Sequence, residues 1–238
     1  MILIVLSTAY SCDVCERDPC QCESPVSADF IMEESSDWFP NFTMETDTMI
    51  LGNNMVFTAL DETASTYEWK VGFDPRTFSE SQFHLSFEDT TTIEVRLIVT
   101  KTKHSECFTE AELRDTVVKQ MHVHDWKTAP TYGKYVGNLE IEGREPKEIE
   151  IEIFASQDHP FTLSNLIDDE FDRFDNCQEI WSGATFYRAV SFESDPGCHN
   201  EMVAILSPNH KTLSIDFGTW NYDTQDYIPS RFIGNKKY

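Results

Sequence analysis

The chain has 238 residues, of which 18 are Lys or Arg and 42 are Asp or Glu, so its formal net charge at pH 7 is −24. This charge repels the phosphate backbone of nucleic acids and the anionic face of a membrane, and we therefore expect no nucleic-acid partner. Hydrophobic residues make up 40% of the chain and aromatic residues 13%. That composition excludes a disordered chain and suits one large or two ordinary folded domains.

The first residues have the character of an export signal. Residues 2–9 form a short apolar run, well below the ~20 residues that a membrane-spanning helix needs. Short apolar runs that end in small residues are typical of export signals. The run stops at Ala9-Tyr10-Ser11-Cys12, which resembles the lipobox of bacterial lipoproteins. The resemblance implies a signal peptide at 1–11 and a lipid on Cys12; a buried edge strand is the alternative.

Residues 12–25 are charged and rich in turn residues and cysteine, and they predict a tether. The chain has seven cysteines, and removing Cys12 for lipidation leaves an even number, which suits disulfides in an oxidising compartment. Cys177 and Cys198 are candidates for one such bond. A metal held by the cysteines of the tether is the alternative; these are Cys12, Cys15, Cys20 and Cys22.

Residues 26–125 predict an all-β domain, because short extended runs alternate with polar turns. The clearest strand is 92–100, which places Ile93, Val95, Leu97 and Val99 on one face. The other predicted strands are 28–32, 55–60, 66–71, 82–87 and 116–124. Six strands in about a hundred residues are typical of a β-sandwich.

The residue order in this domain resembles the PKD family of immunoglobulin-like sandwiches. The matching runs are Ala28-Asp29-Phe30, Val56-Phe57-Thr58-Ala59, the segment 66–72 and the closing run 115–123. The resemblance implies an immunoglobulin-like spacer domain. Trp69 is expected to fill the core of such a sandwich and to be buried.

Two further patterns in this domain are candidate sites. Trp38, Phe39 and Phe42 lie in a polar stretch, where exposed aromatic clusters either contact a ligand or cover a second core; Trp38 is the ligand-binding candidate. His122 and His124 share one face of the last strand, a spacing that suits a metal, but no third ligand is identifiable, so we interpret them as an ordinary surface pair, with a metal site as the alternative.

Residues 126–133 have the Pro, Gly and small polar residues of a linker, and residues 134–238 predict a second β-domain. Segments 135–142 and 148–154 alternate strictly and predict a hairpin. Its inward residues would be Leu139, Ile141, Ile149, Ile151 and Ile153. The glutamates on its other face would repel one another across the sheet, by roughly 0.2–1 kcal/mol per pair, unless solvent screens them or a cation or basic partner binds there.

Later strands are predicted at 162–165, 184–192, 202–206 and 212–217. The runs 133–137, 204–207 and 213–217 look like the lipocalin-like domains of Bacteroidota surface lipoproteins. The resemblance implies an antiparallel barrel or half-barrel with a ligand pocket at its mouth. Trp181, Trp220 and Tyr222 are the candidates for stacking on a sugar or an apolar small molecule, and core packing is the alternative.

Catalytic and metal signals are weak. The acidic run 168–175 has the oxygen density that calcium prefers, with Asp168 and Asp172 as candidate ligands, but a solvated loop is the ordinary explanation of such a charge run. The sequence has no nucleophile elbow, zinc-protease motif or phosphate-binding loop. We therefore expect no enzyme and no cofactor, with calcium as the exception.

Together these patterns predict a lipid-anchored protein of the bacterial outer membrane, exposed on the cell surface. Its PKD-like domain would act as a spacer for a C-terminal β-domain that binds a glycan or a small apolar ligand, or other surface proteins. Its contact with the membrane would be through the lipid only. A small glycoside hydrolase, which needs only two well-placed carboxylates, and a structural adhesin fragment are the alternatives.

Overall fold

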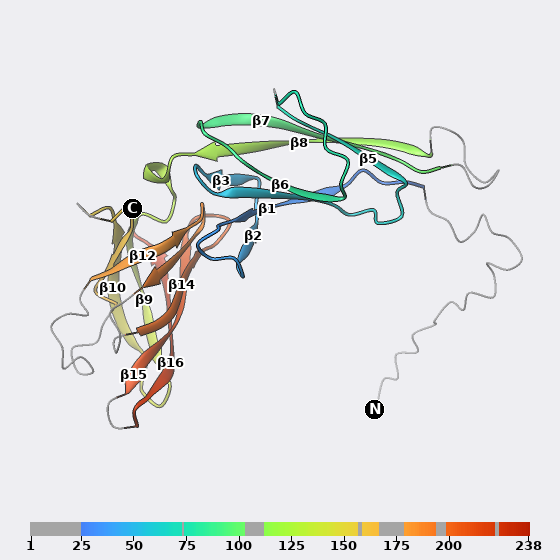
Figure 1. Ribbon diagram of the computed structural model, residues 1–238. Helices are drawn as coiled ribbons and strands as arrows, with labels where there is room; N and C mark the ends of the chain where they lie inside the picture. Colours follow the sequence, from blue (N-terminus) through green and yellow to red (C-terminus); the bar gives the residue numbers. More distant parts are fainter. Residues whose placement is uncertain are drawn as a thin grey trace, which may run out of the picture. The chain divides into compact units, whose positions relative to one another are not determined.

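A computed structural model describes residues 25–72, 74–102, 112–156, 159–166, 179–193, 199–221 and 224–238. Within these residues the fold is all-β, as predicted, and the only helical element is the short 3-10 helix η3 (Trp126–Thr128). The strands form two four-stranded sheets and one closed eight-stranded barrel (Figure 1). No helix among the described residues is long and apolar enough to cross a membrane.

Contacts divide the chain into two compact units. The first contains residues 1–31, 58–83 and 94–119, and the second contains residues 32–57, 84–93 and 120–238. Several strands of the two sheets, such as β7, have residues in both units. The barrel belongs wholly to the second unit.

The two four-stranded sheets resemble the layers of a sandwich. One has the order β2-β1-β4-β6, with β1 (Phe30–Ser35), β2 (Thr43–Glu45), β4 (Asn54–Ala59) and β6 (Gln82–Ser86). The other has the order β3-β8-β7-β5, with β3 (Thr48–Ile50), β5 (Thr66–Val71), β7 (Thr91–Thr100) and β8 (Arg114–His124). The predictions missed β2 and β3, which are only three residues long.

The alternation of buried and exposed residues explains why the longest strands form. On β7 the alternate residues Ile93, Val95, Leu97 and Val99 are all buried, which confirms the predicted inward face. Antiparallel pairing with β5 places Leu97 opposite Trp69. Side chains from neighbouring strands thus share one core face.

Trp69 is the largest side chain of the first unit's core, and it is fully buried, as predicted. Its ring meets the edges of Phe30 and Phe83 at centroid distances of 5.1 and 5.2 Å. Its indole N–H donates to the carbonyl of Glu80 at 2.9 Å. The ring therefore has both apolar contacts and a partner for its one polar group.

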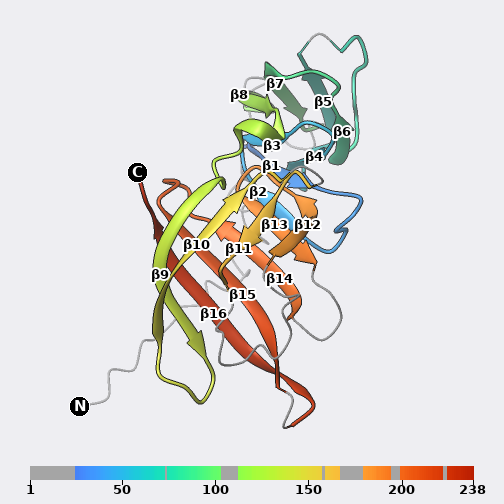
Figure 2. The ribbon, with the colours of Figure 1, turned by 90° about the vertical axis from the view of Figure 1, so that its left-hand side faces the viewer.

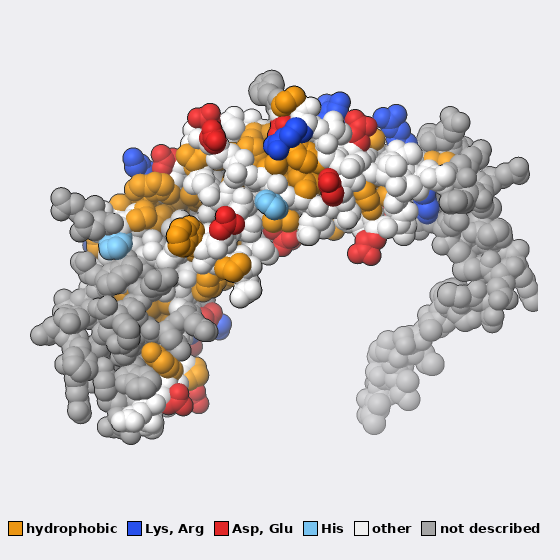
Figure 3. Space-filling model, viewed as in Figure 1, with side chains coloured by type: hydrophobic (Ala, Val, Ile, Leu, Met, Phe, Trp, Pro, Cys, Tyr) orange, Lys and Arg blue, Asp and Glu red, His pale blue; other side chains and the backbone are white. Residues whose placement is uncertain are grey.

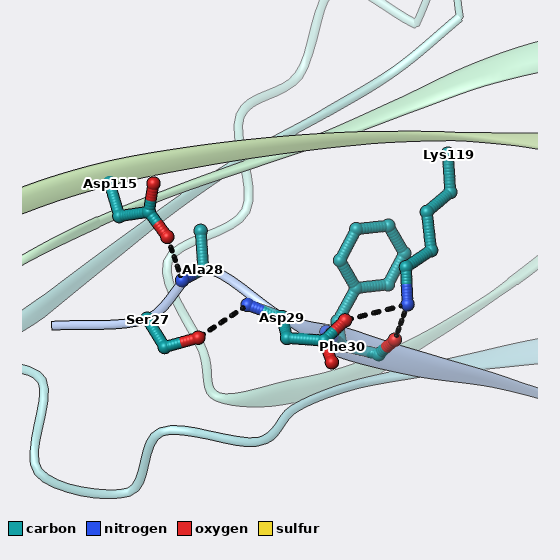
Figure 4. A network of polar contacts seen from close by, with 6 residues as sticks. All are labelled: Ser27, Ala28, Asp29, Phe30, Asp115 and Lys119. Carbon is teal, nitrogen blue, oxygen red and sulfur yellow. Dashed lines mark hydrogen bonds and ion pairs between the residues drawn. The ribbon is translucent and has the colours of Figure 1, made fainter.

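Two side chains of β8 fix the start of β1 in the first unit (Figure 4). A carboxylate oxygen of Asp115 accepts from the backbone N–H of Ala28 at 2.8 Å. The Lys119 ammonium donates to the Asp29 carboxylate at 2.8 Å and to the Phe30 carbonyl, and it lies 4.6 Å from the centre of the Phe30 ring. The hydrogen bond from Lys119 holds the pKa of Asp29 below its ordinary value. These bonds join strands that belong to different sheets.

Replacing Trp69 with Ala should leave a large cavity in this core. We expect the free energy of unfolding to fall by about 3–5 kcal/mol, measured by urea denaturation. Trp38→Ala is the matched control, because Trp38 is 86% exposed and a surface truncation should change stability by no more than about 0.5 kcal/mol. Equal losses in the two variants would contradict the assignment of Trp69 to the core.

The barrel is built from eight antiparallel strands, and β9 closes it by pairing with both β10 and β16 (Figure 2). Its strands are β9 (Gly133–Ile141), β10 (Lys147–Phe154), β11 (Thr162–Ser164), β12 (Glu179–Thr185), β13 (Ala189–Glu193), β14 (His199–Leu206), β15 (Thr212–Asn221) and β16 (Asp226–Lys236).

Two strand predictions in the barrel were wrong or incomplete. The predicted strand 184–192 is two strands, β12 and β13, which are joined by a tight turn in which the Phe186 N–H donates to the Ala189 carbonyl at 2.7 Å. The apolar residues that suggested a single strand lie at the end of β12, in the turn and in β13. The long strand β16 was not predicted at all, although it forms the last step of the ring.

Inward side chains fill the described interior of the barrel with a hydrophobic core. The residues of this core with no more than 2% exposure include Tyr135, Leu139, Ile151, Ile153, Leu163, Val190, Ala204, Leu206, Leu213, Ile215 and Phe232. The inward positions predicted for the first hairpin are therefore confirmed for its buried members.

The acidic face of that hairpin is arranged differently from the prediction. The register places Glu148 opposite Asn138 and Glu152 opposite Lys134, while β16 places an arginine opposite Glu140. The predicted like-charge pairs do not form because the loop of the hairpin offsets the two strands. Lys134 lies 3.5 Å from the carboxylates of both Glu150 and Glu152. The repulsion is thus relieved by exposed cations, each of which contributes little by itself.

Closure also requires glycine at one point. Gly137 of β9 lies opposite Gly234 of β16, and a Cβ added to Gly137 would collide with the carbonyl of Ile233. The two backbones approach too closely for any side chain at this position.

Candidate functional site

An aromatic groove lies in the second unit, where the end of β10 meets η3 and the start of β9. Its cavity volume is about 480 Å³, which is within the range of small-molecule sites. Its lining residues are Trp126, Lys127, Tyr132, Gly133, Glu152, Ile153, Phe154 and Ala155. We call these residues the aromatic groove.

The alternation of β10 determines which of its side chains reach the groove. Ile151 and Ile153 are buried in the barrel core, so Glu152 and Phe154 lie on the outer face of the same strand. The carboxylate of Asp125 caps η3 by accepting from the Lys127 N–H at 3.0 Å. This cap fixes the turn that carries Trp126.

Packing holds the tyrosine of the groove in place. The Tyr132 ring stacks on Phe161 with a centroid distance of 4.5 Å and an angle of 6°. Its hydroxyl donates to the carbonyl of Pro160 at 2.6 Å, and burial raises the pKa of this hydroxyl above its ordinary value. Tyr132 therefore stays neutral and fixed in orientation at physiological pH.

The charges at the groove balance. The Lys127 ammonium lies 5.4 Å from the centre of the Trp126 ring, and Glu152 is paired with Lys134 at 3.5 Å. Three half-buried aromatic side chains with one carboxylate and one ammonium beside them suit a ligand that has an apolar face and no large charge.

A second hollow, of about 520 Å³, lies at the β9–β10 loop and is lined largely by charged side chains. Arg231 is bonded there to Asp216 at 2.6 Å. On the face drawn in Figure 3, acidic side chains are spread over the described surface and do not gather in one patch. Of these two hollows, only the aromatic groove has aromatic side chains in its lining.

Sequence reasoning missed this groove. It assigned Trp126 and Tyr132 to a linker and Phe154 to the end of a strand, so each was interpreted separately. The stacking partner Phe161 is 29 residues from Tyr132. Only the aromatic content of the linker could have indicated a site.

The predicted candidate Trp38 is 86% exposed. It lies in the loop between β1 and β2, while Phe39 and Phe42 from the same loop pack on a small core cluster of the second unit. Phe42 meets Phe186 edge-on at 4.9 Å. Phe39 and Phe42 thus cover a second core, which was one of the two alternatives, while Trp38 is exposed and its contact with a ligand stays a prediction.

The paired histidines lie beside each other, with a centroid distance of 6.5 Å. His122 Nδ1 is 3.0 Å from the hydroxyl of Thr92, and the His124 ring packs on Tyr187 at 5.1 Å. Within the described part of the chain, no group of three or more His, Cys, Asp or Glu residues is placed to hold a metal.

The other predicted site residues fall outside what the structure describes. These are Cys12, Asp168, Asp172, Cys177, Cys198 and Tyr222. The backbones of Trp181 and Trp220 lie in β12 and β15, but their side chains are also outside the described set.

A buried carboxylate, Glu34, is the most unusual polar group of the second unit, and no sequence pattern indicated it. Its side chain is inaccessible to solvent. It accepts hydrogen bonds from the N–H of Ile50, the side-chain amide of Asn53 and the N–H of Tyr187, each at 2.7 Å. Asn53 also donates to the carbonyl of Thr185 at 2.6 Å. Glu34 therefore joins β1, the end of β3 and the β12–β13 turn within this unit.

Burial raises the pKa of Glu34 from 4.5 to about 7. Its three hydrogen bonds and the charge of Arg188 act in the opposite direction but are outweighed. The guanidinium of Arg188 donates instead to the carbonyls of Glu45 and Leu206. Glu34 thus has no directly bonded cation among the described residues.

This pKa gives a pH dependence of stability. The folded chain binds the Glu34 proton more tightly than the unfolded chain does, so stability from this group is full below about pH 4.5 and declines as the pH rises to about 7. The pKa difference corresponds to about 3 kcal/mol. Glu34→Gln should remove this slope, measured by denaturant unfolding at pH 5 and pH 8. Parallel pH profiles for the two proteins would show that Glu34 stays ionised when folded.

Comparison with known proteins gave no relatives. No protein-family model, no curated protein and no solved structure matches the chain.

Proposed function

We propose that the chain is a lipid-anchored binding protein of a bacterial cell surface, in which the barrel carries a site for a neutral ligand with an apolar face, such as a glycan. The immunoglobulin-like, PKD-type sheets would act as the spacer, and the barrel would be the lipocalin-like binding domain. The lipobox-like run that ends at Cys12 supports the anchor. The closed antiparallel barrel supports the assignment of the second domain.

The observation that carries the binding proposal is the aromatic groove. Sugars present C–H faces that pack on aromatic rings while their hydroxyls bond to nearby polar groups. Trp126, Tyr132 and Phe154 offer rings, and Glu152 and Lys127 offer an acceptor and donors beside them. The fixed orientation of Tyr132 means that little side-chain entropy is lost on binding.

The binding proposal is tested with a panel of neutral oligosaccharides, including maltoheptaose and cellohexaose, followed by tryptophan fluorescence and calorimetry. Phe154→Thr introduces a β-branched residue, which suits a strand, and should weaken binding at least tenfold, because it removes one ring of the groove. Ile205→Thr is the matched control, since Ile205 is exposed on another strand of the barrel. Unchanged affinity in Phe154→Thr would place the ligand elsewhere, and no binding by any neutral sugar would refute a glycan site.

The anchor is tested separately in cells. Cys12→Ser should move the protein from the membrane fraction to the soluble fraction, because a lipid chain on that sulfur would be the only attachment. Intact-mass measurement of the membrane-extracted wild type should give a chain that begins at an acylated Cys12. A mature chain with an unmodified Cys12 would end the lipoprotein proposal without affecting the groove.

A further inference from the structure

The loop that carries Trp38 is built to hold this ring in solvent. Two backbone bonds, from the Phe39 N–H to the Ser36 carbonyl and from the Phe42 N–H to the Phe39 carbonyl, are each 3.1 Å long and fold the loop into successive turns. The carboxylate of Asp37 accepts from the Asn54 side chain at 3.0 Å.

The base of the loop is anchored by apolar contacts. Phe39 and Phe42 lie 5.7 Å apart and pack on the cluster of Met44, Ala184, Phe186 and Ala189. A loop fixed in this way loses little conformational entropy when its tip is bound. Tryptophan is also one of the residue types enriched at the energetic centres of protein interfaces. We call residues 36–42 the Trp38 finger.

The aromatic groove has the complementary character. Its walls are the rings of Trp126, Tyr132 and Phe154. The Glu152 carboxylate in its lining is paired with Lys134 at 3.5 Å, whereas the exposed ammonium of Lys127 lies at its edge without a carboxylate partner among the described ion pairs. The finger carries the exposed carboxylate of Asp37 directly beside Trp38. An aromatic tip with an adjacent negative charge therefore matches an aromatic groove with an adjacent positive charge.

We propose that the Trp38 finger of one copy of this chain occupies the aromatic groove of a second copy. Trp38 is 86% exposed and so does not fill the groove of its own chain. The finger and the groove are different surfaces, so the contact is heterologous, and each copy keeps one free finger and one free groove. Copies can then associate head to tail.

The contact is small, and two chains of charge −24 repel each other, so association in solution is weak. Chains anchored in one membrane would be concentrated, which favours weak contacts. This inference rests on the proposed function, because it uses the same groove. It adds a regulation, in which a neighbour's Trp38 competes with the glycan for the site.

Complementation between variants tests the inference with the full chain, by sedimentation velocity across a concentration series at 0.15 M salt. Trp38→Ser and Phe154→Thr should each weaken self-association at least tenfold. An equimolar mixture of the two should recover a 1:1 dimer, because one partner supplies the groove and the other the finger. Ile205→Thr should associate as the wild type does. Failure of the mixture to dimerise, or unaltered association of either single variant, overturns the inference.

A charge exchange gives a second readout. Asp37→Lys and Lys127→Asp should each weaken association, and the double variant should restore it, because the opposite charges then meet in reverse order. No recovery in the double variant means that the two residues do not meet.

Sugar titration separates the two proposals. Maltoheptaose or cellohexaose should dissociate the wild-type assemblies, and Trp38→Ser should bind these sugars as the wild type does. If sugar binds but the chains do not associate, the inference fails and the proposed function stands. If the chains associate by complementation but no sugar binds, the glycan assignment fails and the finger–groove contact stands.

Discussion

The pairing of β9 with both β10 and β16 is the constraint on which the second unit depends. An open sheet would leave two rows of unpaired backbone groups at its edges, whereas a closed ring pairs every strand on both sides. Closure also defines an inside, and only then does the alternation of each strand separate buried from exposed residues. Gly137 and Gly234 show how tight this closure is, because the two backbones meet where a side chain would not fit.

The groove is a consequence of the same closure. The barrel interior is filled by apolar side chains, and the described hollow with aromatic walls lies where the end of β10 meets η3 and the start of β9, with Phe154 facing away from the core. The segment before β9 adds Trp126 and Tyr132 to the lining. A site of this kind depends on the path of a connecting segment and on which alternate residues of one strand face outward. A shift of one residue in either would remove the site.

The segment 33–50 gives the second unit its other unusual features. It places a carboxylate where no water reaches it, and it holds an aromatic ring almost wholly in solvent. Both arrangements cost free energy in isolation. The cost of burying the carboxylate is offset in part by three hydrogen-bond donors from separate elements. The cost of exposing the ring would be relieved where another molecule covers it. This contrast makes the segment a functional candidate and not merely a long connection.

The sequence by itself determined the all-β class, the inward faces of β7 and of the first barrel hairpin, and the burial of Trp69, because period-two alternation is a local property that each strand carries alone. It also marked Trp38 as unusual. Only the tertiary structure decided the register that separates the hairpin glutamates, the division of 184–192 into two strands, and the place of β16 in the ring. The aromatic groove and the burial of Glu34 were likewise invisible beforehand, since Tyr132 meets Phe161 and Glu34 meets Tyr187 across 29 and 153 residues. Such contacts are set by how strands pair at a distance, and no local pattern of side chains encodes that pairing.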